Sequence, residues 1–484
     1  MRTLIVNGTV VNADGSQIAD VLIEAERIVA VEPGLGQRVG AVDRLIDAAR
    51  RLVIPGAVDA HTHMELPVGA VISKDTFETG TRAAAFGGTT TIIDFATQAK
   101  GGSLRKGLDD WLAKADGHAC IDYGFHMAMC DVNDGTLAEM DSLVAQGVPT
   151  FKLFTAYPDR MYSDDGAILR AMLQTARNGG LALMHAENGI AVDVLADRYV
   201  AAGQTDPWYH GLAHASALEG EAAHRVITLA GIAGVPVYIV HVSAREAVDE
   251  VQVARERGLP VFAETCPQYL FLSLDLLRGG VDLGSPGDAG GPGDGDGPGD
   301  PFEGAKFVCS PPLRTPEHHE ALWQGLVEGD LQVVGTDHCP FDYAGQKELG
   351  RGDFRKIPNG LPGVEERVDL LHDGGVVAGR FSRERWVELI AAAPARLFGL
   401  WGRKGGVAPG FDADVVVYDP DRRHTLSART HHMNVDYSCY EGREMQGGSD
   451  VVISRGQVIV DRGEWRGRPG HGRFLSRGLP LLNG

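Results

Sequence analysis

Short apolar runs recur through the middle of this chain, and longer stretches with a helical pattern separate most of them. We identify eight runs, at 52–60, 89–95, 123–129, 149–154, 181–184, 235–240, 260–263 and 331–335. The helical stretches include 77–86, 104–115 and 218–232. Eight strands alternating with helices over about 350 residues are typical of an α/β protein with a (β/α)8 barrel, which takes ~250 residues plus insertions. A doubly wound open sheet fits the same periodicity and stays open as an alternative.

Both ends of the chain have a different pattern, made of short β segments. Near the start, Asn7-Gly8 separates two apolar triplets, and this dipeptide supplies the positive φ angles of a tight hairpin. Similar short segments return at 414–418, 451–454 and 457–460. Small β units at both termini, around a different middle, predict one sheet domain built from both ends of the chain.

One segment, at about 284–301, is of low complexity. It is rich in glycine, proline and aspartate and contains no large apolar residue. Such a composition cannot offset the entropy lost on ordering, so we expect a disordered surface loop between the seventh and eighth strands. The aspartates repeat irregularly, which argues against a calcium site.

Composition narrows the classes of function. The 65 acidic and 45 basic residues give a formal net charge of −20, which argues against a phosphate-backbone partner such as nucleic acid. The six cysteines are scattered without a C-x-x-C pair, as expected of reduced thiols. No signal peptide is evident, and no run of about 18 apolar residues predicts a membrane span. We therefore expect a cytoplasmic protein with neither a nucleic acid nor a membrane partner.

Side chains that can bind metals lie near the end of five of the eight runs or just after it. His61 and His63 end the first run, and in an extended strand both rings point to the same side. Two packed imidazoles are costly to bury unless something binds both, and a divalent metal does so. Because all strand ends of a barrel open onto one face, polar residues that end other runs would join this pair. The sequence therefore predicts a metal centre made of His61, His63, Lys152, His185, His241 and Asp337.

Lys152 is unusual in this set, because an ammonium repels a metal cation. It lies between apolar residues in a strand that should be buried, where desolvation favours the neutral amine. A neutral amine can take up CO₂ and become a carbamate, whose two oxygens can bridge two metal ions. Four imidazoles, one carbamate and one carboxylate suit two zinc ions roughly 3.5–4 Å apart, with a hydroxide held between them.

Six motifs extend beyond these ligands, at 58–65, 151–157, 184–188, 309–314, 335–341 and 357–363. Together they resemble the cyclic amidohydrolases, in the dihydropyrimidinase and D-hydantoinase branch. The similarity extends from about residue 6 to about residue 460, although His-x-His alone is shared by many metal-dependent hydrolases. The chain departs from the pattern in the 284–301 insertion and at Cys439, where proline is more usual.

The resemblance implies a fold and an assembly. It implies a β-sandwich built from 1–54 and 405–484, and a metal-dependent (β/α)8 barrel over 55–404. Members of this family are commonly homotetramers, and a homodimer is the alternative. The partner would be a small cyclic amide or ureide.

The resemblance also implies the role of each ligand: His61 and His63 on one zinc ion, His185 and His241 on the other, and Lys152 between them as N6-carboxylysine. Asp337 would complete the first zinc site. The hydroxide between the ions would attack a ring carbonyl, while Asp337 carries the proton to the leaving ring nitrogen. Tyr157 would donate a hydrogen bond to the developing oxyanion, and Ser310 and Asn359 would orient the substrate.

The expected reaction opens 5,6-dihydropyrimidines or 5-substituted hydantoins to N-carbamoyl amino acids. An allantoinase is the alternative within the enzyme class. A dihydroorotase is disfavoured, because 64–67 contains no arginine to hold a substrate carboxylate. A non-catalytic assembly or signalling relative is the alternative of a different class. We interpret His126, His338 and Cys339 as packing or supporting residues.

Overall fold

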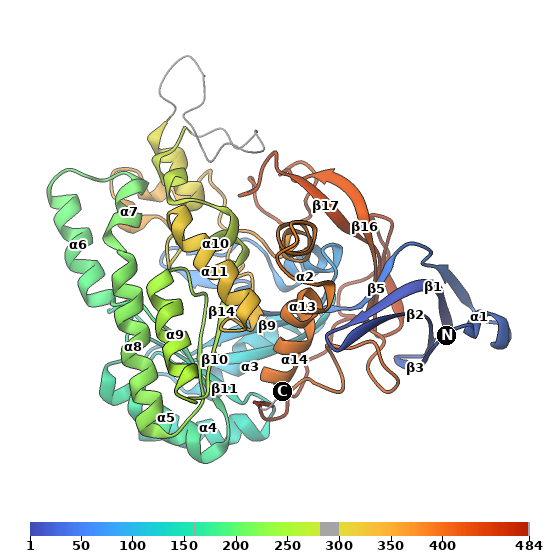
Figure 1. Ribbon diagram of the computed structural model, residues 1–484. Coiled ribbons are helices and arrows are strands. Elements are labelled where there is room, and N and C mark those ends of the chain that lie inside the picture. The colour runs from blue at the N-terminus through green and yellow to red at the C-terminus, as the bar shows by residue number, and fades with distance from the viewer. Residues whose placement is uncertain (159, 281–299, 483–484) are drawn as a thin grey trace.

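A computed structural model describes residues 1–158, 160–280 and 300–482. Figure 1 shows a helix-surrounded barrel on one side and a layer of strands from both termini on the other. No helix in the described ranges is long and apolar enough to cross a membrane.

The barrel is an eight-stranded sheet in which every neighbouring pair is parallel. Its strands follow one another in chain order: β6 (Ala57–Thr62), β9 (Thr89–Thr97), β10 (Asp122–Ala128), β11 (Thr150–Phe154), β12 (Leu181–His185), β13 (Val237–Ile239), β14 (Val261–Thr265) and β15 (Val333–Val334). The first and last strands approach each other, since Thr62 bridges His338 and the Thr336 hydroxyl donates to Asp59 at 2.7 Å. The (β/α)8 prediction is confirmed, and the open sheet is wrong.

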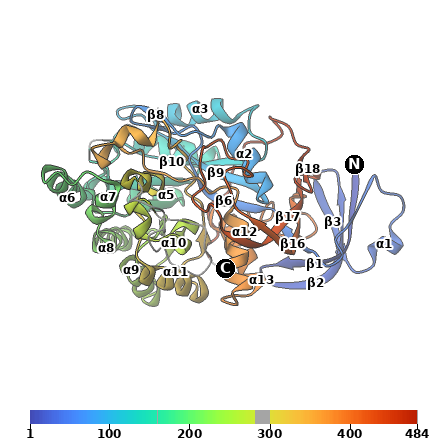
Figure 2. The same cartoon turned by 90° about the horizontal axis from the view of Figure 1, so that it is seen from above.

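Helices surround the strands, as the view from above shows (Figure 2). The longer ones are α2 (Phe77–Phe86), α3 (Leu104–Ala115), α4 (Asp134–Ala145), α5 (Asp165–Asn178), α6 (Gly189–Ala201), α7 (Pro207–Ala213), α8 (Ser216–Ala233), α9 (Arg245–Glu256) and α11 (Pro316–Glu328). Helix α3 shows why they form. The Ser103 hydroxyl caps its first turn by accepting from the Lys106 amide at 3.0 Å. Its buried residues Leu104, Leu108 and Trp111 recur at helical spacing, so one face packs on the barrel.

Short helices and single turns complete the barrel region. They are α10 (Pro267–Phe271), η1 (Leu274–Arg278), η2 (Pro301–Phe307), η3 (Lys347–Gly350), η4 (Phe354–Lys356), α12 (Arg367–Leu371), η5 (His372–Val377), α13 (Arg383–Val387), η6 (Glu388–Ala392) and α14 (Ala393–Leu397). Two short strands, β7 (Pro67–Val68) and β8 (Val71–Ile72), form a separate pair. Turns η2, η3 and η4 lie in the long connections near the carboxyl ends of β14 and β15, the face where the site residues gather.

The two termini form one nine-stranded sheet. It contains β1 (Arg2–Asn12), β2 (Gly15–Glu24), β3 (Arg27–Glu32), β4 (Arg44–Asp47), β5 (Leu52–Pro55), β16 (Val415–Thr425), β17 (Glu444–Ser454), β18 (Gln457–Asp461) and β19 (Glu464–Trp465), with α1 (Leu35–Arg38) beside β1 and β2. Strand β5 pairs with both β1 and β16 and so joins the two ends of the chain. Val10, Val21, Val415 and Ile453 share one buried core. The predicted combination of a TIM barrel with a β-sandwich domain is confirmed, while the domain limits 1–54, 55–404 and 405–484 stay a prediction.

Two local predictions are wrong. The run 52–60 is two strands, since β5 belongs to the terminal sheet and β6 to the barrel, with Gly56 packed against the Thr90 side chain between them. Asn7-Gly8 does not make a hairpin. The positive φ of Asn7 (63°) instead allows a bulge inside the continuous strand β1.

The segment predicted to be a disordered loop, 284–301, falls almost wholly outside the described residues. Its last two residues are described and are ordered. The Asp300 carboxylate accepts from the Phe302 amide at 2.9 Å, and Pro301 begins η2. The prediction of a disordered loop is therefore wrong for these two residues.

Candidate metal centre and substrate side

The six predicted ligands come together at the carboxyl ends of the barrel strands. Parallel pairing explains the direction of Lys152: it is the partner of Leu183, which belongs to the buried cluster of alternate strand residues inside the barrel. Residues paired across neighbouring strands point to the same face, so Lys152 also points inward. His185 lies two residues after Leu183 in β12 and continues that face.

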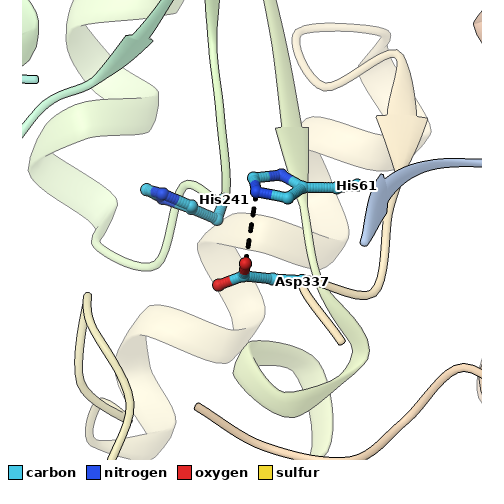
Figure 3. A group of neighbouring side chains, drawn as sticks. All are labelled: His61, His241 and Asp337. Carbon is cyan, nitrogen blue, oxygen red and sulfur yellow. Dashed lines mark ion pairs between the residues drawn. The ribbon is translucent and has the colours of Figure 1, made fainter. Parts of the chain in front are cut away.

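One group of contacts centres on His61. Its Nε2 lies 3.2 Å from Asp337 Oδ1 and 3.2 Å from Lys152 Nζ. The same Asp337 oxygen lies 3.0 Å from Nε2 of His63. Figure 3 shows the ion pair between His61 and Asp337, with His241 beside it. His61, His241 and Asp337 offer ligand atoms that lie within 4.8 Å of one another.

A second group adjoins the first. His185 Nδ1 lies 2.9 Å from His241 Nε2, and the His241 ring is 5.3 Å from the ring of His61. Burial lowers the pKa of His63 to about 4 and that of His241 well below its usual value. Both rings are therefore neutral and keep a lone pair, which is the form that binds metals.

Charge in this centre is balanced by burial and by neighbouring groups. Burial lowers the pKa of Lys152 to about 8, so a share of the amine is neutral near physiological pH. Burial raises the pKa of Asp337, but contacts with His61 and His63 lower it more, and the carboxylate stays ionised. The aromatic ring of Phe95 lies 4.2 Å from Lys152 Nζ.

The donor set fits a metal centre better than it fits a packed core. Two of its closest contacts join nitrogen to nitrogen, Lys152 to His61 and His185 to His241. Such pairs satisfy at most one donor each, and burying them without a shared cation is costly. Two histidine pairs, an amine and a carboxylate that face one another can together hold divalent ions.

Three predicted site residues have strained backbones. Tyr157 (φ 63°), His241 (φ 41°) and Asp337 (φ 52°) adopt the left-handed region, which L-residues with large side chains rarely enter. Each follows a barrel strand, and the sharp turn directs its side chain toward the strand ends. Strain of this kind persists where the surrounding structure holds it, and it is concentrated at functional sites.

The predicted substrate residues lie next to the second group of ligands. The Tyr157 ring is 5.1 Å from the His185 ring. Burial raises the pKa of the Tyr157 phenol above its usual value, partly opposed by a hydrogen bond with the Ser310 side chain, so the phenol stays protonated and able to donate. The Asn359 amide donates to Ser310 Oγ at 3.0 Å. Asn359 therefore contacts another predicted substrate residue through its side chain.

Comparison with known proteins identifies the family of the chain. A model of the amidohydrolase family matches residues 52–458. The chain belongs to the amidohydrolase family. This amidohydrolase is 57% identical over 478 residues to the D-hydantoinase of Streptomyces coelicolor, with 98% of each chain covered. It is 43% identical to the D-hydantoinase of Geobacillus stearothermophilus, over 99% of this chain and 97% of the relative. The dihydropyrimidinase structure from Brevibacillus agri matches with a TM-score of 0.93 at 42% identity, covering 99% of each chain.

These comparisons confirm two predictions for this amidohydrolase. The resemblance to the dihydropyrimidinase and D-hydantoinase branch is confirmed, and so is the prediction of a hydrolase. The non-catalytic alternative is set aside, since the relatives carry enzyme names. The role of each individual side chain stays a prediction.

Two carboxylates that contact the predicted ligands of this amidohydrolase were missed by the sequence analysis. Glu264 accepts from His61 Nδ1, and from the Tyr238 hydroxyl at 2.9 Å. Glu187 lies 3.0 Å from His185 Nε2. A carboxylate on the far nitrogen fixes the ring of a metal-binding histidine. Glu264 could have been found, because it stands near the end of β14, the seventh strand, to which no ligand was assigned.

The histidines set aside as packing residues have structural partners. His126 lies 2.7 Å from the Thr150 hydroxyl and 3.0 Å from the Ala60 carbonyl. His338 Nε2 lies 3.0 Å from Asp75, and its other nitrogen accepts from the Gly363 amide at 3.1 Å. Both residues use both ring nitrogens, and neither belongs to the metal-binding group.

Proposed function

We propose that this amidohydrolase opens the ring of 5-substituted hydantoins and 5,6-dihydropyrimidines to N-carbamoyl amino acids at a centre of two zinc ions. The observation that carries the proposal is the meeting of two histidine pairs, Lys152 and Asp337 beside a protonated phenol. The relatives support the choice of substrate class, because they are named D-hydantoinase and dihydropyrimidinase. The homotetramer implied by the resemblance stays a prediction.

The residues present match the two metal ions that we propose. His61, His63 and Asp337 would hold one ion, and His185 and His241 the other. Lys152 would bridge the ions as N6-carboxylysine, formed when the free amine adds to CO₂ and releases a proton. Because burial lowers the pKa of Lys152 to about 8, part of the amine is neutral at physiological pH and can react with CO₂. When bound, the two ions would supply hydroxide at neutral pH and polarise a ring carbonyl.

The protein's own groups would then guide the proton and the substrate. The ionised Asp337 can accept a proton and return it to the leaving ring nitrogen. Tyr157 can donate its O–H to the oxygen on which negative charge develops. Ser310 and Asn359, joined by their hydrogen bond, would orient the ring amide beside Tyr157.

A substrate panel on protein of known zinc content tests the proposal. We expect turnover of dihydrouracil, hydantoin and the D-enantiomers of 5-substituted hydantoins, with N-carbamoyl products identified by mass spectrometry. Allantoin, dihydroorotate and L-5-substituted hydantoins should be slower. Faster turnover of allantoin would instead establish the allantoinase alternative. Zinc-loaded protein that opens none of these rings would refute the proposal.

A further inference from the structure

A second buried lysine, Lys347, lies at the start of η3 and was not among the predicted site residues. Its side chain is fully buried. Its Nζ donates to the carbonyls of Val308 at 3.0 Å and Pro358 at 3.1 Å. Burial lowers its pKa to about 8, an effect that nearby cysteine side chains partly oppose. Among the described residues, no carboxylate lies within ion-pairing distance of this amine.

The two carbonyls belong to the segments that carry the substrate residues. Val308 lies two residues before Ser310, and Pro358 lies directly before Asn359. The same segments are joined twice more, because the Gly360 amide donates to the Val308 carbonyl at 3.0 Å and Asn359 donates to Ser310 at 3.0 Å. Lys347 therefore joins the backbones of both segments through one amine.

The stability of the fold does not explain why a lysine amine is buried against two backbone carbonyls, whereas a positioning role does. A lysine amine is costly to bury, and without a carboxylate nearby the two carbonyls only partly offset that cost. An apolar side chain of similar length would avoid the cost. It would also remove the donor that the two carbonyls share, so the two segments would be joined only by the Gly360–Val308 and Asn359–Ser310 hydrogen bonds. The amine is therefore better explained by the spacing that it maintains.

We propose that Lys347 is a positioning residue for substrate binding, which fixes the segments around Ser310 and Asn359 at the spacing needed to hold a cyclic amide beside Tyr157. This inference rests on the proposed function. It concerns the affinity for substrate, because Lys347 has no contact with the predicted metal ligands among the described residues. A displacement of about 1 Å in a positioning segment can cost up to about a hundredfold in catalytic efficiency.

The test compares steady-state kinetics of wild-type protein with Lys347→Met and Lys347→Gln. We expect Lys347→Met to raise KM for the best ring substrate about tenfold or more, while kcat falls less than about threefold. Zinc content should stay at the wild-type value. Lys347→Gln keeps two N–H donors on a shorter side chain and should recover part of the loss in KM.

The matched control is Lys306→Met. Lys306 lies two residues before Val308 in the same connection, but its amine reaches Glu303 at 3.5 Å instead of a carbonyl of the two segments. Its substitution should leave KM within twofold of wild type. If Lys347→Met does not fold, the test rests on Lys347→Gln. A raised KM with full zinc in that variant supports the inference, and an unchanged KM overturns it.

The outcomes separate the inference from the proposed function. An inactive wild-type protein with full zinc would count against the proposed function. An active wild type whose KM is unchanged by Lys347→Met would overturn the inference alone. An equal rise in KM for Lys306→Met would also overturn it, since the effect would then be general to the connection. Loss of zinc in Lys347→Met would move the role to the metal centre and overturn it as well.

Discussion

The site has a metal side, formed by the predicted metal ligands, and a substrate side, formed by the predicted substrate residues. Different parts of the fold build the two sides. On the metal side, His61, Lys152 and His185 belong to barrel strands. The other three predicted ligands lie within three residues of a strand end: His63, His241 and Asp337. On the substrate side, Ser310 and Asn359 belong to long connections without strands, held by backbone hydrogen bonds and by Lys347. Strand ends position a side chain more accurately than loops do, so the loops need added support.

The two sides also differ in the chemical groups that hold their residues in place. Carboxylates hold the metal side: Glu264 fixes the His61 ring and also accepts from the His241 amide at 3.2 Å. An amine holds the substrate side, through carbonyls instead of side chains. Each choice follows from what must be held, since an imidazole N–H needs an acceptor and a backbone carbonyl needs a donor. Substitutions on one side should therefore change zinc content, and substitutions on the other should change KM or kcat.

The largest effect is expected for Lys152→Ala on the metal side. Removing the proposed bridge leaves neither ion with its full set of ligands, so bound zinc and activity should be lost together. Added propionate should restore part of both, because a short carboxylate can enter the space left by the side chain. Zinc content by elemental analysis and turnover of hydantoin provide the measurement. Full zinc and full turnover in the variant would show that Lys152 is not the bridge.

Tyr157→Phe on the substrate side should have the next largest effect. The substitution keeps the ring beside His185 and removes only the phenolic donor, whose loss should lower kcat by about 10²–10³-fold. Zinc content should not change, which separates this variant from Lys152→Ala. A kcat within a few-fold of wild type would show that Tyr157 only packs at the barrel rim.

The same contrast explains what the sequence could predict. Each predicted metal ligand stands at or just after an apolar strand, and parallel strands of a barrel end on one face. His61, Lys152 and Asp337 could therefore be grouped without any structure. Ser310 and Asn359 stand in connections with no regular period. Only the motif resemblance identified them, and nothing in the sequence linked them to Lys347, since the contact runs through the backbone carbonyls of other residues. Likewise, the split of 52–60 at Gly56 depends on packing against Thr90, which no local pattern shows.

Glu264→Gln, on the metal side, should have the smallest effect of the three substitutions. Glutamine keeps one oxygen acceptor but loses the charge and the second acceptor, so the His61 ring and the His241 backbone are held less firmly. Weakening such a support typically costs about 10–100-fold in metal affinity, and we expect zinc dissociation to become that much more favourable while excess zinc restores activity. Competition with a chelator of known affinity measures the change. Tyr238→Phe removes only the 2.9 Å bond to the other oxygen of Glu264 and should weaken zinc binding less than Glu264→Gln does. If the two variants bind zinc equally well, the carboxylate does not support the metal ligands in the way its contacts indicate.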